Sequence, residues 1–241
     1  MHLRPLKLAS LLIILTGGIP VLHSLSNETD PAIPTGTLSA TPKSVQPGTY
    51  PLLTWDITYP EKVTDVVDIE TPGKITPTED LYMDVRVLGA SFQSSPGDWK
   101  PIQAWVKADG STSWSSFFYD TQPNVDPTKV YHSQLVRAGR PNYFGGRYYW
   151  NGWGYFHNTT QTSSQNVIAL VNGDEPPAYA PAFNQGDVES FLAPYLDDNG
   201  KIKIGPMDVI FLYELYSTNP GSSYFDMQDL VLLVTFRRVE S

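Results

Sequence analysis

The chain has 241 residues, a formal net charge of -9 and no cysteine. This length allows one large domain or two small ones. An acidic surface argues against nucleic acid and anionic membrane as partners, because both repel negative charge. A domain without disulfides must be stabilised by its hydrophobic core, and about 200 residues suffice for that. The absence of cysteine is ordinary in exported bacterial proteins, which favours a bacterial source.

Residues 1–24 have the composition of a signal peptide. Arg4 and Lys7 precede an apolar stretch over 8–19, and a small residue at Ser24 offers a cleavage point. The apolar stretch is shorter than the roughly 20 residues that cross a bilayer. We therefore expect cleavage, no membrane insertion afterwards, and a secreted, periplasmic or cell-surface location. An uncleaved N-terminal anchor is the alternative.

Residues 25–37 are rich in Ser, Thr and Pro and predict a flexible leader. From residue 38 onward, short runs of β-branched and aromatic residues alternate with turn signals, which predicts a single β-sandwich domain over 38–241. The strands expected before the C-terminal region cover 52–57, 63–70, 81–88, 99–107, 113–119, 130–137, 167–171 and 201–204. The runs 99–107 and 113–119 form a hairpin across a tight turn at 108–111.

Residues 38–57 carry a loose sequence motif. Pro42 follows the first apolar run, Pro47 and Gly48 form a turn signal, and Trp55 lies in the next run. This order resembles the opening of bacterial immunoglobulin-like domains, in which a second strand carries an inward Trp. The resemblance covers residues 38–57, implies the start of a β-sandwich and implies no activity. The paired cysteines of antibody-type members are missing.

One segment, 187–196, has the pattern of a helix. Asp187 can cap its N-terminus. Apolar side chains recur at i, i+3, i+4 and i+7, at Val188, Phe191, Leu192 and Tyr195. Pro194 lacks a backbone donor and should bend or shorten this helix.

The two most apolar runs after the signal peptide are 207–216 and 230–236. Alternation places one set of apolar side chains on a single face of the first run: Met207, Val209, Phe211, Tyr213 and Leu215. Both runs are apolar on both faces in their middle, so we expect an antiparallel pair at the centre of a sheet covered on two sides. The fold class predicted is mainly β: an antiparallel β-sandwich, immunoglobulin-like or jelly-roll-like, with one short helix near 187–196.

The most unusual composition lies in residues 143–156, which are rich in aromatic residues and glycine. Flat ring faces can stack on the apolar faces of sugars, while Asn and Arg supply hydrogen bonds. The candidate ligand-binding residues are Arg147, Tyr148, Trp150, Asn151, Trp153 and Tyr155. The alternative is that these rings fill the core, with the glycines marking bulges.

Catalytic signals are sparse. After the signal peptide the only histidines are His132 and His157, and neither a His-Glu-x-x-His nor a Gly-x-Ser-x-Gly motif occurs. The Asp and Asn of 197–200 indicate a turn rather than a calcium loop, since lysines follow where a ligating Glu is needed. We expect no metal and no cofactor.

The function expected first is a non-catalytic, secreted or cell-surface β-sandwich with a structural or interaction role, whose partner is a polysaccharide or a surface protein. A carbohydrate-binding module is the alternative. A glycoside hydrolase-like enzyme is third, because a pair of carboxylates needs no local motif.

Overall fold

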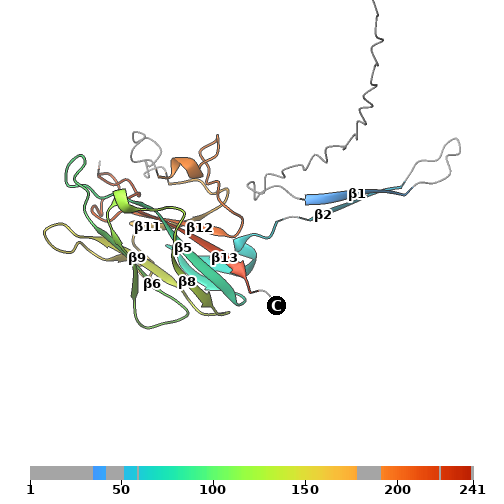
Figure 1. The fold of residues 1–241 in the computed structure, drawn as a ribbon, viewed down its shortest axis with the longest axis horizontal. Helices are drawn as coiled ribbons and strands as arrows, with labels where there is room; N and C mark the ends of the chain where they lie inside the picture. The colour runs from blue at the N-terminus through green and yellow to red at the C-terminus, as the bar shows by residue number, and fades with distance from the viewer. Residues whose placement is uncertain (1–34, 42–51, 59, 178–190, 223, 240–241) are drawn as a thin grey trace, which may run out of the picture.

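Two antiparallel sheets pack face to face in the computed structural model, which describes residues 35–41, 52–58, 60–177, 191–222 and 224–239 (Figure 1). The five-stranded sheet has the order β11 (Val167–Val171), β12 (Asp208–Tyr213), β13 (Leu230–Arg238), β5 (Leu81–Ala90) and β8 (Val130–Val136). The four-stranded sheet has the order β10 (His157–Asn158), β9 (Tyr143–Tyr148), β6 (Ile102–Lys107) and β7 (Ser115–Asp120). The predicted antiparallel β-sandwich is confirmed.

Smaller elements surround these sheets. Two separate pairs are β1 (Thr35–Thr41) with β2 (Leu52–Thr58), and β3 (Val67–Glu70) with β4 (Lys74–Pro77). The helical turns are α1 (Val63–Val66), η1 (Gln122–Asn124) and η3 (Ala193–Tyr195).

The predicted central pair is β12 and β13. These strands are antiparallel neighbours inside the five-stranded sheet, and Phe211 lies directly opposite Leu232. Both side chains are fully buried. The ring centroid of Phe211 lies 4.9 Å from that of Phe144 in the opposite sheet, so this contact links the two layers. The inner core is completed by alternating side chains of both sheets, among them Met83, Val85, Val87, Ile102, Ala104, Val106, Val209, Val234 and Phe236.

A second core covers the other face of the five-stranded sheet. Ile210, Leu212 and Val231 point to this side and pack against apolar side chains of the segments that cross it. Those covering side chains are Leu192, Ile202, Ile204, Phe225 and Met227. The expectation that this sheet is covered on both faces is therefore confirmed.

Three local predictions differ from the structure. Residues 63–70 were expected to form one strand, but α1 occupies their first half; the Lys62 backbone N–H donates to the Asp65 carboxylate at 3.0 Å, which closes a helical turn instead. Residues 201–204 form no strand, and Ile202 makes only an isolated bridge with Leu196. Of the helix expected over 187–196, residues 187–190 lie outside the described residues, and the rest contains only the short η3, which carries Pro194 in its first turn.

The hairpin of β1 and β2 lies outside the two-layered body in Figure 1. Leu38 pairs with Trp55, and the Trp55 side chain is 67% exposed. The expectation of an inward Trp at this position is therefore wrong. A two-stranded ribbon has no second layer against which to bury one face.

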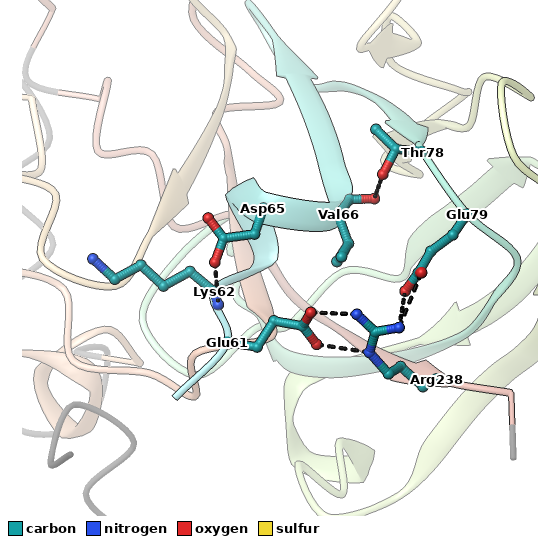
Figure 2. Close-up of polar contacts among 7 residues, drawn as sticks. All are labelled: Glu61, Lys62, Asp65, Val66, Thr78, Glu79 and Arg238. Atoms are coloured by element: carbon teal, nitrogen blue, oxygen red, sulfur yellow. Dashed lines mark hydrogen bonds and ion pairs between the residues drawn. The ribbon is translucent and has the colours of Figure 1, made fainter. Parts of the chain in front are cut away.

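Ion pairs link the C-terminal end of β13 to the segments on either side of α1 (Figure 2). Arg238 forms ion pairs with Glu61 and with Glu79, the latter at 2.9 Å. The hydrogen bond from Arg238 lowers the pKa of the Glu61 carboxyl. In the same region Thr78 donates through its backbone N–H and its hydroxyl to the Val66 carbonyl, at 2.8 and 3.0 Å. These contacts fix the sheet end where the chain enters the sandwich.

Candidate functional site

The candidate site is the outer face of the four-stranded sheet, which points away from the five-stranded one. Strand β6 sets this face by simple alternation: Ile102, Ala104 and Val106 are buried inward, so the intervening side chains point outward. Register places the outward residues of the neighbouring strands beside them. The outward side chains of the three long strands are Gln103, Trp105, Lys107, Ser116, Tyr119, Tyr143 and Arg147.

A glycine lets the chain after β9 fold back over this face. Gly145 lies opposite Trp105, and a Cβ at Gly145 would come within 2.6 Å of the Phe156 ring. Any larger residue would displace that ring, because real contacts to a Cβ are not so short. The Phe156 ring can therefore lie across β9 and join the aromatic side chains of β6.

At one end of the face, three exposed rings surround an arginine. Trp153 lies 5.1 Å from Tyr149 and 5.7 Å from Tyr119, measured between ring centroids. The Arg147 guanidinium carbon lies 3.9 Å from the Trp153 ring centroid and 5.5 Å from that of Trp105. The cation is thus held between two indole rings by cation–π contacts.

The row continues across the sheet to a lysine. Phe156 makes edge contacts with Trp105 at 6.3 Å and with Trp114 at 5.0 Å. The Lys107 ammonium lies 5.5 Å from the Trp114 centroid and 4.6 Å from that of Tyr143. We call these nine residues the aromatic row: Trp105, Lys107, Trp114, Tyr119, Tyr143, Arg147, Tyr149, Trp153 and Phe156.

The rings at the arginine end are open to solvent. Trp153 is 45% exposed, Tyr149 42% and Tyr119 54%. Trp150 and Tyr155 are also exposed, so the alternative that the 143–156 rings fill the core is wrong for the two indoles and for Tyr155. The rings of β9 itself are more covered, because Phe144 points into the core, Lys107 lies over Tyr143, and Tyr148 stacks on Phe92.

The structure divides the six predicted residues between surfaces. Arg147 and Trp153 belong to the aromatic row, whereas Tyr148 stacks on Phe92 at 4.0 Å and Trp150 lies 6.3 Å from that same ring. Asn151 directly follows Trp150 and is exposed in the tight turn that leads to Trp153, with a φ of 55°. We call the second group the end cluster: Phe92, Tyr148, Trp150, Tyr216 and Tyr224.

The sixth predicted residue, Tyr155, borders a polar groove of about 580 Å³. Hydroxyl and amide side chains of 160–166 line it together with His157, whose side chain is buried. Burial lowers the pKa of His157 to about 4, so the ring is neutral at pH 7. Gln161 donates to the Tyr155 hydroxyl at 3.0 Å, which ties the ring to the groove wall.

Several residues of the aromatic row were not among the predicted site residues. The outward set of β6 contains Trp105 and Lys107, and the alternation of 102–107 with its buried Ile, Ala and Val carries that information in the sequence. Tyr119 lies on β7, the hairpin partner of β6, and Trp114 directly precedes that strand. Their proximity to Arg147 depends on the pairing of β6 with β9, for which the sequence holds no local signal.

Two carboxyls are buried at the base of the loop between β12 and β13. Glu214 accepts backbone N–H groups of Tyr216, Ser217 and Asp226 at 2.6 to 3.0 Å. Asp229 accepts the backbone N–H of Leu215 at 2.6 Å. Burial raises the pKa of both, to about 7 for Glu214, and repulsion between the two carboxylates adds to the rise for Asp229. Their bonds hold the loop in place.

These carboxyls predict a pH-dependent effect of Asp229→Asn. The folded protein keeps the acid protons to higher pH than the unfolded chain does, so this pair lowers stability as pH rises from about 4.5 to 7 and beyond. His157 acts in the opposite direction below pH 6.5, so the wild-type profile alone mixes both effects. Asn retains an oxygen for the Leu215 N–H but cannot ionise.

We therefore expect the melting temperature of the variant, relative to wild type, to rise between pH 5 and pH 8. The increase is expected because burial keeps the Asp229 carboxyl protonated in the folded state at pH values where the unfolded chain is ionised, a cost that an amide does not have. Differential scanning fluorimetry at both pH values measures it. An equal difference at pH 5 and pH 8 contradicts the assigned pKa direction.

A cavity of about 320 Å³ lies beside β3, the turn after it, and β11. It bears on the hydrolase hypothesis, since Glu70 and Asp174 line it. Glu70 forms an ion pair with Lys74 at 2.6 Å, and Asp174 accepts the Val171 backbone N–H at 2.8 Å. Both carboxylates are thus engaged in local structure.

Within the described ranges, no three His, Cys, Asp or Glu side chains gather as potential metal ligands. In the same part of the chain, no helix has the length and apolar character needed to cross a membrane. Comparisons with protein-family models, curated protein sequences and solved structures gave no match to this chain.

Proposed function

We propose that this protein is a non-catalytic, exported β-sandwich that binds polysaccharide on the outer face of its four-stranded sheet. The observation that supports the proposal most is the aromatic row, in which aromatic rings and two cationic side chains lie together across neighbouring strands, with the rings exposed at the arginine end. Tyr149 and Trp153 lie in the loop after β9, where an isolated backbone bridge and a ring contact between them limit their freedom, so less conformational entropy is lost when a ligand packs on them.

The chemistry of the row suits a sugar chain. The exposed faces of Trp153, Tyr149 and Tyr119 can cover apolar C–H surface, and such burial stabilises by about 25 cal/mol per Å². Gln103 and Ser116 lie among the rings and can exchange hydrogen bonds with hydroxyl groups. A row that crosses several strands favours an extended polymer over a compact small molecule.

A surface protein is the competing partner for the same face, because Trp, Tyr and Arg are also common at protein interfaces. Polysaccharide is favoured since the row combines flat rings with hydrogen-bonding side chains.

Native affinity electrophoresis tests the proposal. The purified protein is run in gels that each contain one polysaccharide, covering neutral glucans, mannans, uronate polymers and sulfated polymers, beside a reference protein that binds none. We expect retardation in at least one gel, abolished by soluble oligosaccharide of the same type. Unchanged migration in every gel would overturn the proposal.

A further inference from the structure

The outward side chains of the four-stranded sheet carry a charge opposite to that of the whole protein. The chain has 25 acidic and 16 basic residues, yet the outward positions of β6, β7 and β9 hold Lys107 and Arg147 and no Asp or Glu. A cationic surface within an acidic protein attracts anions while the rest of the molecule repels them. The placement therefore bears on which polysaccharide the face selects.

Neither cation of the row is neutralised by a carboxylate within the described part of the chain. Six other basic residues form ion pairs there: Lys74, Lys100, Arg137, Lys201, Arg237 and Arg238. Lys107 and Arg147 instead contact aromatic rings. A ring partner leaves the positive charge available, whereas a carboxylate partner cancels it.

Arg147 is oriented by its neighbours. Its Nε and Nη2 atoms donate to the Gln103 side-chain oxygen at 3.3 and 3.0 Å. Gln103 is itself fixed, since its amide donates to the Ser116 hydroxyl at 3.1 Å. A guanidinium has five N–H donors in a planar fork. The donors that Gln103 does not use can bind a carboxylate or a sulfate, for which this geometry is well suited.

Lys107 supplies a second charge farther along the sheet. Its ammonium lies over Tyr143 and Trp114, and Lys107 is paired with Tyr143 in the register of β6 and β9. Tyr143 precedes Arg147 by four residues of β9, which corresponds to roughly 13 Å at the rise of a strand. That span exceeds one sugar ring, so the two cations would contact different units of a polymer.

We propose, on the basis of the proposed function, that the ligand of this face is an anionic polysaccharide whose charged groups bind Arg147 and Lys107 while its sugar rings pack on Trp153 and its neighbours. The shared chemistry is an anion repeated along the sugar chain, either a uronate carboxylate or a sulfate ester. A neutral polymer would use the rings alone and bind more weakly.

Affinity electrophoresis with matched polymers tests this proposal. The arms are a uronate polymer, the same polymer after reduction of its carboxyls to alcohols, a neutral glucan, and that glucan after sulfation. We expect reduction of the carboxyls, or absence of the sulfates, to weaken binding roughly tenfold, since it removes charged hydrogen bonds. Added salt should weaken binding only to the charged polymers. The charged polymer that retards the protein more strongly shows whether the bound anion is a carboxylate or a sulfate.

Three variants test whether the preference for charged polymers arises at the aromatic row. Arg147→Gln and Lys107→Gln should each weaken binding to the charged polymer several-fold, and by a larger factor than they weaken binding to the neutral one. Lys129→Gln is the matched control, because the Lys129 ammonium also lies over a ring, that of Tyr131 at 4.8 Å, but outside the row. Melting curves establish that each variant is folded. If one row variant fails to fold, the other alone still tests the contribution of the row's charge.

The outcomes separate the two proposals. Equal binding to charged and neutral polymers overturns the anionic ligand but leaves polysaccharide binding intact. A loss in Lys129→Gln as large as in the row variants also overturns it, since the attraction would then be non-specific. Unaltered binding to every polymer in both row variants overturns it as well. Retention by no polymer at all overturns polysaccharide binding itself.

Discussion

Phe211→Asp should prevent the chain from folding. The Phe211 side chain is fully buried between the layers, directly opposite Leu232 and 4.9 Å from the Phe144 ring. Loss of a buried ring costs about 3–5 kcal/mol, and a buried carboxyl without a partner adds several more. Because a domain is stable by only about 5–15 kcal/mol, the sum removes most or all of the folding free energy.

Soluble yield, far-UV circular dichroism and thermal melting measure this effect. Leu232→Asp should behave in the same way, since it places a charge at the paired position of the neighbouring strand. Tyr224→Asp is the control, because Tyr224 is 71% exposed and its replacement should leave the melting temperature almost unchanged. Wild-type melting of Phe211→Asp would show that β12 is wrongly placed at the centre of the sheet.

Trp153→Ala should weaken polysaccharide binding by roughly 30-fold. Trp153 contacts Tyr149, Tyr119 and Arg147, so its removal takes away a stacking surface and also frees the guanidinium that the ring holds. A central aromatic residue at a binding surface is commonly worth about 2 kcal/mol, which corresponds to that factor. Because the side chain is 45% exposed, the melting temperature should change little.

Trp150→Ala is the matched control for this experiment. Trp150 lies three residues away in the same loop and is 40% exposed, but its ring lies with Phe92 in the end cluster. Isothermal titration calorimetry with an oligosaccharide of the retained polymer gives both affinities. If Trp150→Ala weakened binding as much as Trp153→Ala, the end cluster would be part of the ligand surface. If only Trp150→Ala did so, the aromatic row would be the wrong surface.

The strands were predictable where apolar side chains alternate with a period of two residues and the segment ends at a clear turn signal. The alternation of 81–88 and the apolar runs at 207–216 and 230–236 all became β-strands with their apolar side chains buried. The hairpin of β6 and β7 also matches, because Asp109 and Gly110 adopt positive φ values of 52° and 69° that suit a tight turn. Local sequence carries this information.

Elements decided by distant contacts were not predictable. Val63 and Val66 lie three residues apart and are both buried, which a short helical turn achieves as well as a strand does. Trp55 is apolar, but its hairpin has no second layer over it, so the ring is exposed. In both cases the residue type is compatible with two structures, and only the tertiary setting selects one.

The candidate site was predicted in part for the same reason. The aromatic composition of 143–156 indicated a segment that supplies several exposed rings, yet its rings divide between two surfaces according to the side of the strand and turn on which each lies. The partners of Arg147 come from β6, some 40 residues earlier in the chain, as the pairing of Gln103 with Arg147 shows. Such a neighbour follows from sheet order, which no local pattern specifies.

The most direct test of ligand binding by the aromatic row is an NMR titration that follows the six indole N–H signals of the protein. Unlabelled oligosaccharide of the retained polymer is added to ¹⁵N-labelled protein. We expect saturable shifts for Trp105, Trp114 and Trp153, with the signals of the three Trp residues outside the row unchanged: Trp55, Trp99 and Trp150. Shifts confined to Trp150, or the absence of any saturable shift, would contradict ligand binding at this face.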